Sequence, residues 1–159
     1  MSLPGEIIQG ILARGALVVL RVYLGVVFLL AALPAVQWDS PADSPGFLGV
    51  ALEQGHPFYR EFVHQVLVPS AAVLGEPLRW TELVVGMTLV LGLLTRLSAA
   101  VALLLALNYM FARGAWFWTP GSSDAAHVAI ALAILIGAAG RTLGLDSLLA
   151  RRWPRSPFW

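Results

Sequence analysis

Residues 78–112 read LRWTELVVGMTLVLGLLTRLSAAVALLLALNYMFA, and this stretch decides the fold class. It contains two apolar runs, 78–95 and 97–112, which meet at Thr95 and Arg96. Each run is near the short limit of about 17–25 residues for a membrane-spanning helix. A connection this short predicts that the two helices form an antiparallel hairpin.

Two further apolar runs, 15–36 and 124–140, bring the number of predicted spanning helices to four. The first run is interrupted only by Arg21 and exceeds the roughly 7–15 apolar residues of a signal peptide, so we expect it to be retained. The chain is 58% hydrophobic and 12% charged, whereas an average soluble domain has about 25% charged residues. This composition predicts one all-α membrane domain over residues 1–159, a four-transmembrane-helix bundle.

The region 37–77 is the long connection between the first two predicted spans. Its first half is rich in proline, serine and aspartate, which is typical of a loop. Pro57 then suits the first position of a helix. After it, Phe58, Phe62 and Val66 recur at helical spacing. We therefore predict a short amphipathic helix that lies at the membrane interface within the first extracytoplasmic loop.

The positions of the arginines predict the orientation in the membrane. All ten basic residues are arginines, and the side with both termini and the 95–96 link would hold Arg14, Arg96, Arg141, Arg151, Arg152 and Arg155. Basic residues concentrate on the cytoplasmic side of membranes. We therefore expect both termini and the tail 141–159 in the cytoplasm, the loop 37–77 outside, and the chain in the cytoplasmic (inner) membrane.

Composition also excludes several classes of function. A net charge of +1 gives no basis for nucleic-acid binding through bulk charge. The absence of cysteine excludes disulfides, thiolate metal sites and c-type haem attachment. No spacing of histidines and carboxylates fits a metal site, so we predict none.

Polar residues inside the predicted spans are the candidate functional residues, because an ionisable group costs roughly 2.5–3.5 kcal/mol at the membrane centre. At about 1.5 Å per residue, Glu82, Asn108, Tyr109 and His127 all lie roughly 6–8 Å below the outer surface. A shared depth on three helices is compatible with one polar pocket near the outer leaflet, and also with separate helix-packing roles. Arg21 lies closer to the inner end, and its long side chain can reach toward Glu82 or down to the inner interface.

Three sequence motifs resemble those of a known family. Residues 21–28 (RVYLGVVF) are similar to a first-helix signature, residues 82–96 (ELVVGMTLVLGLLTR) to a second-helix signature, and Gly140, Arg141, Leu145 and Asp146 to a closing motif. These are signatures of the DoxX/DoxD family of small four-helix membrane proteins, and the resemblance covers roughly residues 14–150. The family includes the membrane subunit of a thiosulfate:quinone oxidoreductase and DoxX-like proteins linked to oxidative stress. Its lysine near the outer end of the first helix has no counterpart, because this chain contains no lysine.

Two functional hypotheses follow from these residues and this resemblance. In the first, the chain is the membrane subunit of a quinone-linked oxidoreductase, with no covalently bound cofactor, and a redox partner protein supplies the electrons. The catalytic candidates are Glu82 and His127, as proton donors and acceptors, and the ligand-binding candidates around a quinone are Arg21, Trp80, Asn108 and Tyr109. The alternative is a non-catalytic scaffold or anchor for a partner protein. A carrier of a small molecule or an ion is a weaker third hypothesis beside these two, and homo-oligomerisation through glycine-containing helix faces stays open.

Overall fold

The computed structural model describes residues 4–33, 46–137 and 144–152. These segments are helical and contain no strand, so the all-α prediction is confirmed for them. The helices are α1 (Pro4–Ala31), α2 (Phe47–Gln54), α3 (Pro57–Phe62), η1 (Val63–Leu67), α4 (Ala71–Leu91), α5 (Thr95–Ala112), α6 (Asp124–Gly137) and α7 (Leu145–Arg152). Of these, η1 is a single turn of π-helix.

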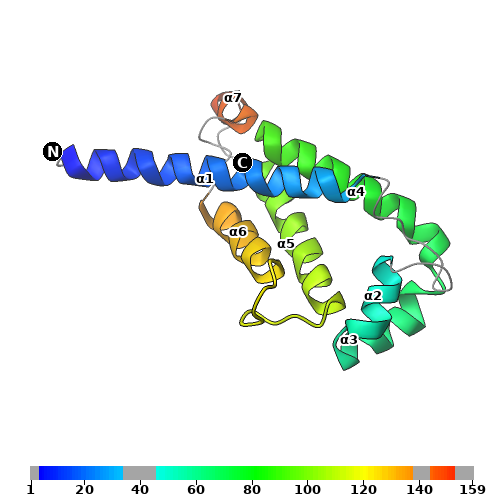
Figure 1. Ribbon diagram of the computed structural model, residues 1–159. Helices are drawn as coiled ribbons and strands as arrows, with labels where there is room; N and C mark the ends of the chain where they lie inside the picture. The colour runs from blue at the N-terminus through cyan, green and yellow to red at the C-terminus, as the bar shows by residue number, and fades with distance from the viewer. Residues whose placement is uncertain (1–3, 34–45, 138–143, 153–159) are drawn as a thin grey trace.

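The four long helices form two pairs. Helix α1 packs along α4, which runs in the opposite direction, and α5 packs against α6 below them (Figure 1). The short helices α2, α3 and η1 cluster beside the end of α5, and α7 lies at the other end of the bundle, beside the turn from α4 to α5 (Figure 1). The predicted connection between α4 and α5 is present, but it consists of residues 92–94, and Thr95 already belongs to α5.

Close packing of α1 on α4 depends on two glycines. A Cβ atom at Gly25 would lie 2.9 Å from the carbonyl oxygen of Gly86, and a Cβ at Gly86 would lie 2.9 Å from the carbonyl oxygen of Gly25. Small residues let helix backbones approach in this way. The core on either side of the crossing contains Leu24, Phe28, Val85 and Leu89. Gly86 therefore packs against another helix of the same chain, and Gly137 likewise packs against Leu17 of α1.

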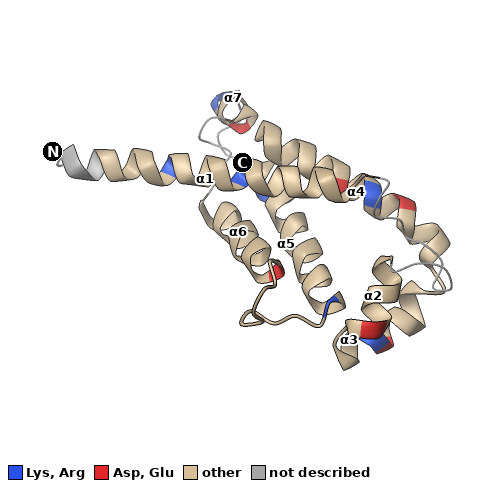
Figure 2. Ribbon diagram, viewed as in Figure 1, with Lys and Arg blue, Asp and Glu red and all other residues tan. Residues whose placement is uncertain are grey.

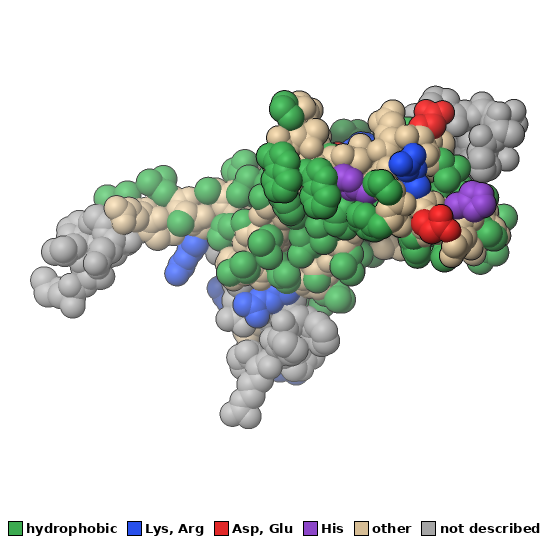
Figure 3. All heavy atoms as spheres, turned by 90° about the horizontal axis from the view of Figure 1, so that it is seen from below, with side chains coloured by type: hydrophobic (Ala, Val, Ile, Leu, Met, Phe, Trp, Pro, Cys, Tyr) green, Lys and Arg blue, Asp and Glu red, His purple; other side chains and the backbone are tan. Residues whose placement is uncertain are grey.

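The outer surface of the bundle is largely apolar, as Figure 3 shows for one face. Large apolar side chains are 51–73% exposed on four different long helices, among them Val19, Val84, Leu104 and Ile136. Charged residues are sparse along these helices (Figure 2). A soluble protein rarely exposes so much contiguous apolar surface, so this surface fits a lipid environment.

Two helical segments, Ile8–Ala31 and Thr95–Ala112, are long and apolar enough to cross a membrane. The described part of α6 has only 14 residues, and α4 carries Glu76, Arg79 and Glu82. The structure thus supports two of the four predicted spans by length and composition.

Several helix bounds differ from the predicted ones. Helix α1 begins at Pro4, eleven residues before the predicted start of the first span. Helix α4 begins at Ala71 and continues through Pro77, although we expected the span to begin after this proline. Pro77 lies in the second turn, where its missing N–H removes a single backbone hydrogen bond. Residues 34–45, 138–143 and 153–159, which include parts of the predicted loop, fourth span and tail, lie outside the described residues.

The predicted amphipathic helix is present as α3 and η1, with Pro57 in its first turn as expected. It has two apolar faces. Tyr59, Val63 and Leu67 are buried against α2 and the end of α5. The face that we predicted from the sequence, Phe58, Phe62 and Val66, is 45–57% exposed. One face therefore belongs to the protein core, and the other is free to contact a membrane interface.

Candidate functional site

A cavity of about 200 Å³ lies between α1, α5 and α6, at the end of the bundle where α5 connects to α6. Helix α1 supplies an apolar wall, and α5 and α6 supply most of the polar groups. The lining residues are Val27, Phe28, Ala31, Ala106, Tyr109, Arg113, Ser123, Asp124 and His127.

Tyr109 connects this cavity to a buried carboxylate. Its ring lines the cavity, and its hydroxyl donates a hydrogen bond to Oε1 of Glu82 on α4. Glu82 is only 3% exposed. The ring of Phe47 packs edge-on against Tyr109, with 5.4 Å between ring centroids, and holds its plane in place. Tyr109 therefore links the lining of the cavity to Glu82, which does not itself line the cavity.

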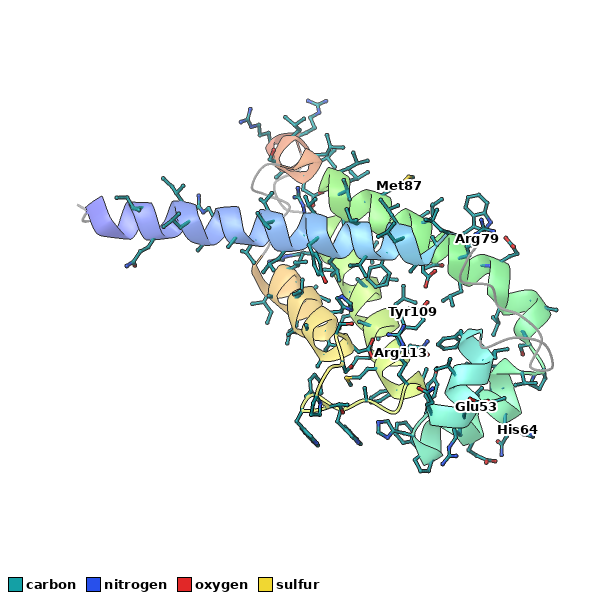
Figure 4. The ribbon with its side chains drawn as sticks, in the orientation of Figure 1. Glu53, His64, Arg79, Met87, Tyr109 and Arg113 are labelled. Atoms are coloured by element: carbon teal, nitrogen blue, oxygen red, sulfur yellow. The ribbon has the colours of Figure 1, made fainter. Side chains whose placement is uncertain are left out.

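An ion pair closes the same end of the cavity. Arg113 follows the last residue of α5, one turn beyond Tyr109 (Figure 4). It forms a salt bridge with Asp124 in the first turn of α6. The Asp124 side chain is 5% exposed and that of Arg113 is 54% exposed, so the arginine brings its charge in from the surface. Its guanidinium carbon lies 5.8 Å from the centroid of the Tyr109 ring. Since Asp124 also begins α6, the helix dipole stabilises its negative charge.

His127 lines the cavity from the next turn of α6. Its Nε2 lies 3.3 Å from the hydroxyl oxygen of Tyr23 on α1, and their ring centroids are 6.0 Å apart. This contact orients the imidazole between α1 and α6. The cavity thus has two titratable side chains in its lining on different helices, Tyr109 on α5 and His127 on α6.

Of the six predicted site residues, Tyr109 and His127 line this cavity, and Glu82 is joined to Tyr109 by a hydrogen bond. Asn108 lies on another face of α5, where its Oδ1 accepts a hydrogen bond from the Tyr59 hydroxyl. It lines a separate apolar groove of about 400 Å³ between α4, α5 and η1. Trp80 is 61% exposed on α4 and borders a third groove, of about 340 Å³. Neither residue lines the cavity that contains Tyr109 and His127.

The hydrogen-bond partner of Asn108 is Tyr59, a titratable residue on the short helix α3. Burial of its phenol raises the pKa of Tyr59 to about 12, and the hydrogen bond to Asn108 acts in the opposite direction. Tyr59 therefore stays neutral throughout the physiological pH range and donates a hydrogen bond to the amide oxygen of Asn108. This bond ties α3 to α5 at Asn108, the residue that precedes Tyr109.

Arg21 belongs to a different cluster at the opposite end of the bundle. Its side chain is 2% exposed and packs against Gly92 in the α4–α5 turn, near enough to Asp146 for electrostatic attraction. The carboxylate of Asp146 accepts hydrogen bonds from the backbone N–H groups of Leu94, at 2.7 Å, and Thr95, at 2.8 Å. From the sequence, the Arg21 side chain could reach toward Glu82 or toward the inner interface. In the structure it reaches away from Glu82.

Sequence reasoning missed Tyr23, Arg113 and Asp124 as parts of the site. Two of these had a signal in their spacing. Arg113 follows Tyr109 by four residues, and Asp124 precedes His127 by three, and both spacings place side chains on one helix face. Tyr23 had no such signal, because it lies within a continuous apolar run.

Comparisons with known proteins agree with this architecture. The family model described as "TQO small subunit DoxD" matches residues 16–156, which include every residue that lines the cavity. No curated protein and no solved structure matches the chain. The match covers nearly the whole chain and confirms the resemblance seen in the three motifs. The chain therefore belongs to the DoxD family of TQO small subunits.

Proposed function

We propose that the chain is the integral-membrane subunit of a quinone-linked oxidoreductase, in which α1, α4, α5 and α6 cross the inner membrane and both termini face the cytoplasm. Helix α4 carries several charges and the described part of α6 is short, but both helices have apolar surfaces that support their assignment as spans. Val84 on α4 is 51% exposed and Ile136 on α6 is 73% exposed. Both side chains would face water if these helices lay outside the bilayer.

The observation that carries the proposal is the pairing of two proton-exchanging groups around one cavity. Interconversion of a quinone and a quinol moves protons at two oxygens on opposite sides of a ring. A general acid or base within hydrogen-bond reach of each oxygen would serve this chemistry. Tyr109, backed by Glu82, serves one oxygen, and His127, oriented by Tyr23, serves the other.

The size of the cavity limits what it accommodates. About 200 Å³ is below the roughly 300–1,000 Å³ of sites for drug-sized ligands, so it suits a single ring. The apolar wall formed by Val27 and Phe28 suits the face of such a ring. A prenyl tail would extend beyond the cavity into lipid. A bound quinone would supply two-electron redox chemistry, and a partner protein would supply or receive the electrons.

The proposal is tested with a Glu82→Gln variant. The glutamine amide keeps nearly the same shape and an oxygen that accepts the Tyr109 hydrogen bond, but it does not exchange a proton. We expect quinone turnover by the assembled oxidoreductase to fall by about 10²–10⁴-fold, the usual contribution of general acid–base catalysis. Quinone binding, measured by native mass spectrometry of the detergent-released complex, should persist.

Glu76→Gln is the matched control, because Glu76 lies on the same helix with a side chain that is 72% exposed. It should turn over at the wild-type rate. Wild-type turnover in the Glu82→Gln variant would contradict the proposed role of Glu82.

A scaffold function is the second candidate, and exposed aromatic residues favour it. Phe58 and Phe62 protrude from α3, and the rings of Trp116 and Trp118 stack on each other with centroids 5.7 Å apart. Trp118 is 76% exposed. Under this proposal, a Phe58→Ser, Phe62→Ser double variant would lose a stoichiometric protein partner in native mass spectrometry. In the same experiment, Glu82→Gln would leave every bound component unchanged.

A further inference from the structure

Helix α7 lies across the end of the bundle and does not extend it. In Figure 1 it is seen along its axis, whereas α1 and α4 lie in the plane of the picture. Its axis therefore crosses the direction of α1 and α4 and does not continue it. If α1 and α4 cross a membrane, α7 runs parallel to the membrane surface, at the level of the α4–α5 turn.

Three hydrogen bonds fix α7 at this level. The backbone N–H of Asp146 donates to the carbonyl oxygen of Gly92 at 2.8 Å. The Asp146 carboxylate accepts the N–H groups of Leu94 and Thr95 in return. Asp146 is completely buried, so this acidic side chain contributes no negative charge to the exposed face of α7.

The exposed face of α7 combines apolar and basic side chains. Leu145 is 41% exposed and Leu148 is 59% exposed, and their spacing of three residues places them on the same side of the helix. Arg151 and Arg152 are exposed in the last turn. An amphipathic helix with leucines on one face and arginines beside them is typical of segments that lie in the headgroup region of a membrane.

We propose that α7 binds the anionic phospholipid headgroups of the membrane leaflet at this end of the bundle. Leu145 and Leu148 would enter the boundary between headgroups and acyl chains. Arg151 and Arg152 would bind lipid phosphates, for which the guanidinium group offers paired N–H donors. Charge complementarity selects this occupant, because the described surface of α7 carries two positive charges and its one acid is buried. Each arginine near an anionic surface strengthens binding roughly fivefold.

The test uses the absence of cysteine from the chain, which makes a single introduced cysteine a unique labelling site. The Leu148→Cys variant is labelled with the environment-sensitive fluorophore bimane and placed in nanodiscs of phosphatidylcholine, with or without phosphatidylglycerol. Acrylamide, an uncharged quencher, reports water access without being repelled by the lipid charge. Leu104→Cys provides the reference, since this α5 position is 67% exposed on the side of the bundle and should be protected in both lipids.

We expect the label at position 148 to shift to the blue and to lose at least half of its quenching only in discs that contain phosphatidylglycerol. Adding Arg151→Gln and Arg152→Gln should reverse this difference between the two lipids. Equal protection in both lipids would overturn the recognition of anionic headgroups. If acrylamide quenched the label at position 148 fully in both lipids, α7 would not contact the membrane and the proposal would be wrong. If the label were protected from acrylamide only in discs that hold two copies of the chain, this face would bind a second copy. That result would also overturn the proposal.

Discussion

Replacing the buried Asp146 with alanine should lower the free energy of unfolding more than replacing the neighbouring Ser147 does. The carboxylate of Asp146 accepts two backbone N–H groups at the start of α5, and both bonds are shorter than 2.9 Å. A hydrogen bond to a charged group contributes about 1.5–3 kcal/mol. Alanine would leave both N–H groups without this acceptor and would also remove a negative charge that attracts the buried Arg21.

The two hydrogen bonds together contribute about 3–6 kcal/mol. Removing one member of a buried charged pair typically costs about 3–5 kcal/mol, so we expect the free energy of unfolding to fall by at least about 3 kcal/mol. Asparagine should cost less. Its single carbonyl oxygen can accept one of the two N–H groups, while its NH₂ group faces the other donor. We expect about 2–3 kcal/mol for Asp146→Asn, because one charge-assisted hydrogen bond is lost and the other becomes neutral.

Reversible unfolding in mixed micelles, with increasing sodium dodecyl sulfate, measures these differences. Ser147→Ala is the neighbouring control, since Ser147 donates one hydrogen bond to the carbonyl oxygen of Gly144 and should cost about 0.5–1.5 kcal/mol. An unfolding free energy of Asp146→Ala within about 1 kcal/mol of the wild type would refute the reasoning, because it would mean that Asp146 does not cap α5.

Two other predictions concern the helix crossing and the bond between α3 and α5. Gly86→Ala should cost about 1–3 kcal/mol of stability by overpacking against the Gly25 backbone, whereas Gly10→Ala, which has open space, should not destabilise in the same unfolding assay. The pKa of Tyr59, raised to about 12, lies above the value of about 10 for a free tyrosine, so its contribution to stability is complete below pH about 10 and is lost as the pH rises toward 12. Tyr59→Phe should abolish the tyrosinate absorbance that develops near pH 12, and loss of an ionisation near pH 10 instead would contradict the burial of this phenol.

The elements that could be predicted from the sequence are those set by local rules. Asp124 begins α6 and Pro57 lies in the first turn of α3, because a carboxylate and a proline each suit the start of a helix. The end of α5 at Ala112 also agrees with the predicted bound. Pro77 shows where a local rule fails. Proline usually interrupts a helix, yet α4 continues through it, because a proline in the second turn removes a single backbone hydrogen bond.

The pairings within the site depend on helix rotation, which the sequence does not determine. Asn108 and Tyr109 are neighbours in sequence at almost the same depth, but they point to different faces of α5, toward Tyr59 and Glu82 respectively. The estimate of depth could therefore place them at one level without showing which of them lines the cavity. The direction of Arg21 likewise depends on α7, whose Asp146 lies far from it in the sequence.

Because Glu82 is hydrogen-bonded to Tyr109, a proposed role of Glu82 in proton exchange can be tested separately from its role in packing. In the described residues its carboxylate is hydrogen-bonded to a tyrosine, and no arginine or histidine nitrogen lies within salt-bridge distance of it. A neutral amide could accept the same hydrogen bond, so packing alone does not require an ionisable group at this position. If α4 crosses the membrane, as we propose, an ionisable residue within it carries a cost that a purely structural role would avoid. Glu82→Gln should therefore leave the fold intact and remove only proton exchange, which makes retained stability with lost turnover the outcome that distinguishes a proton relay from a packing contact.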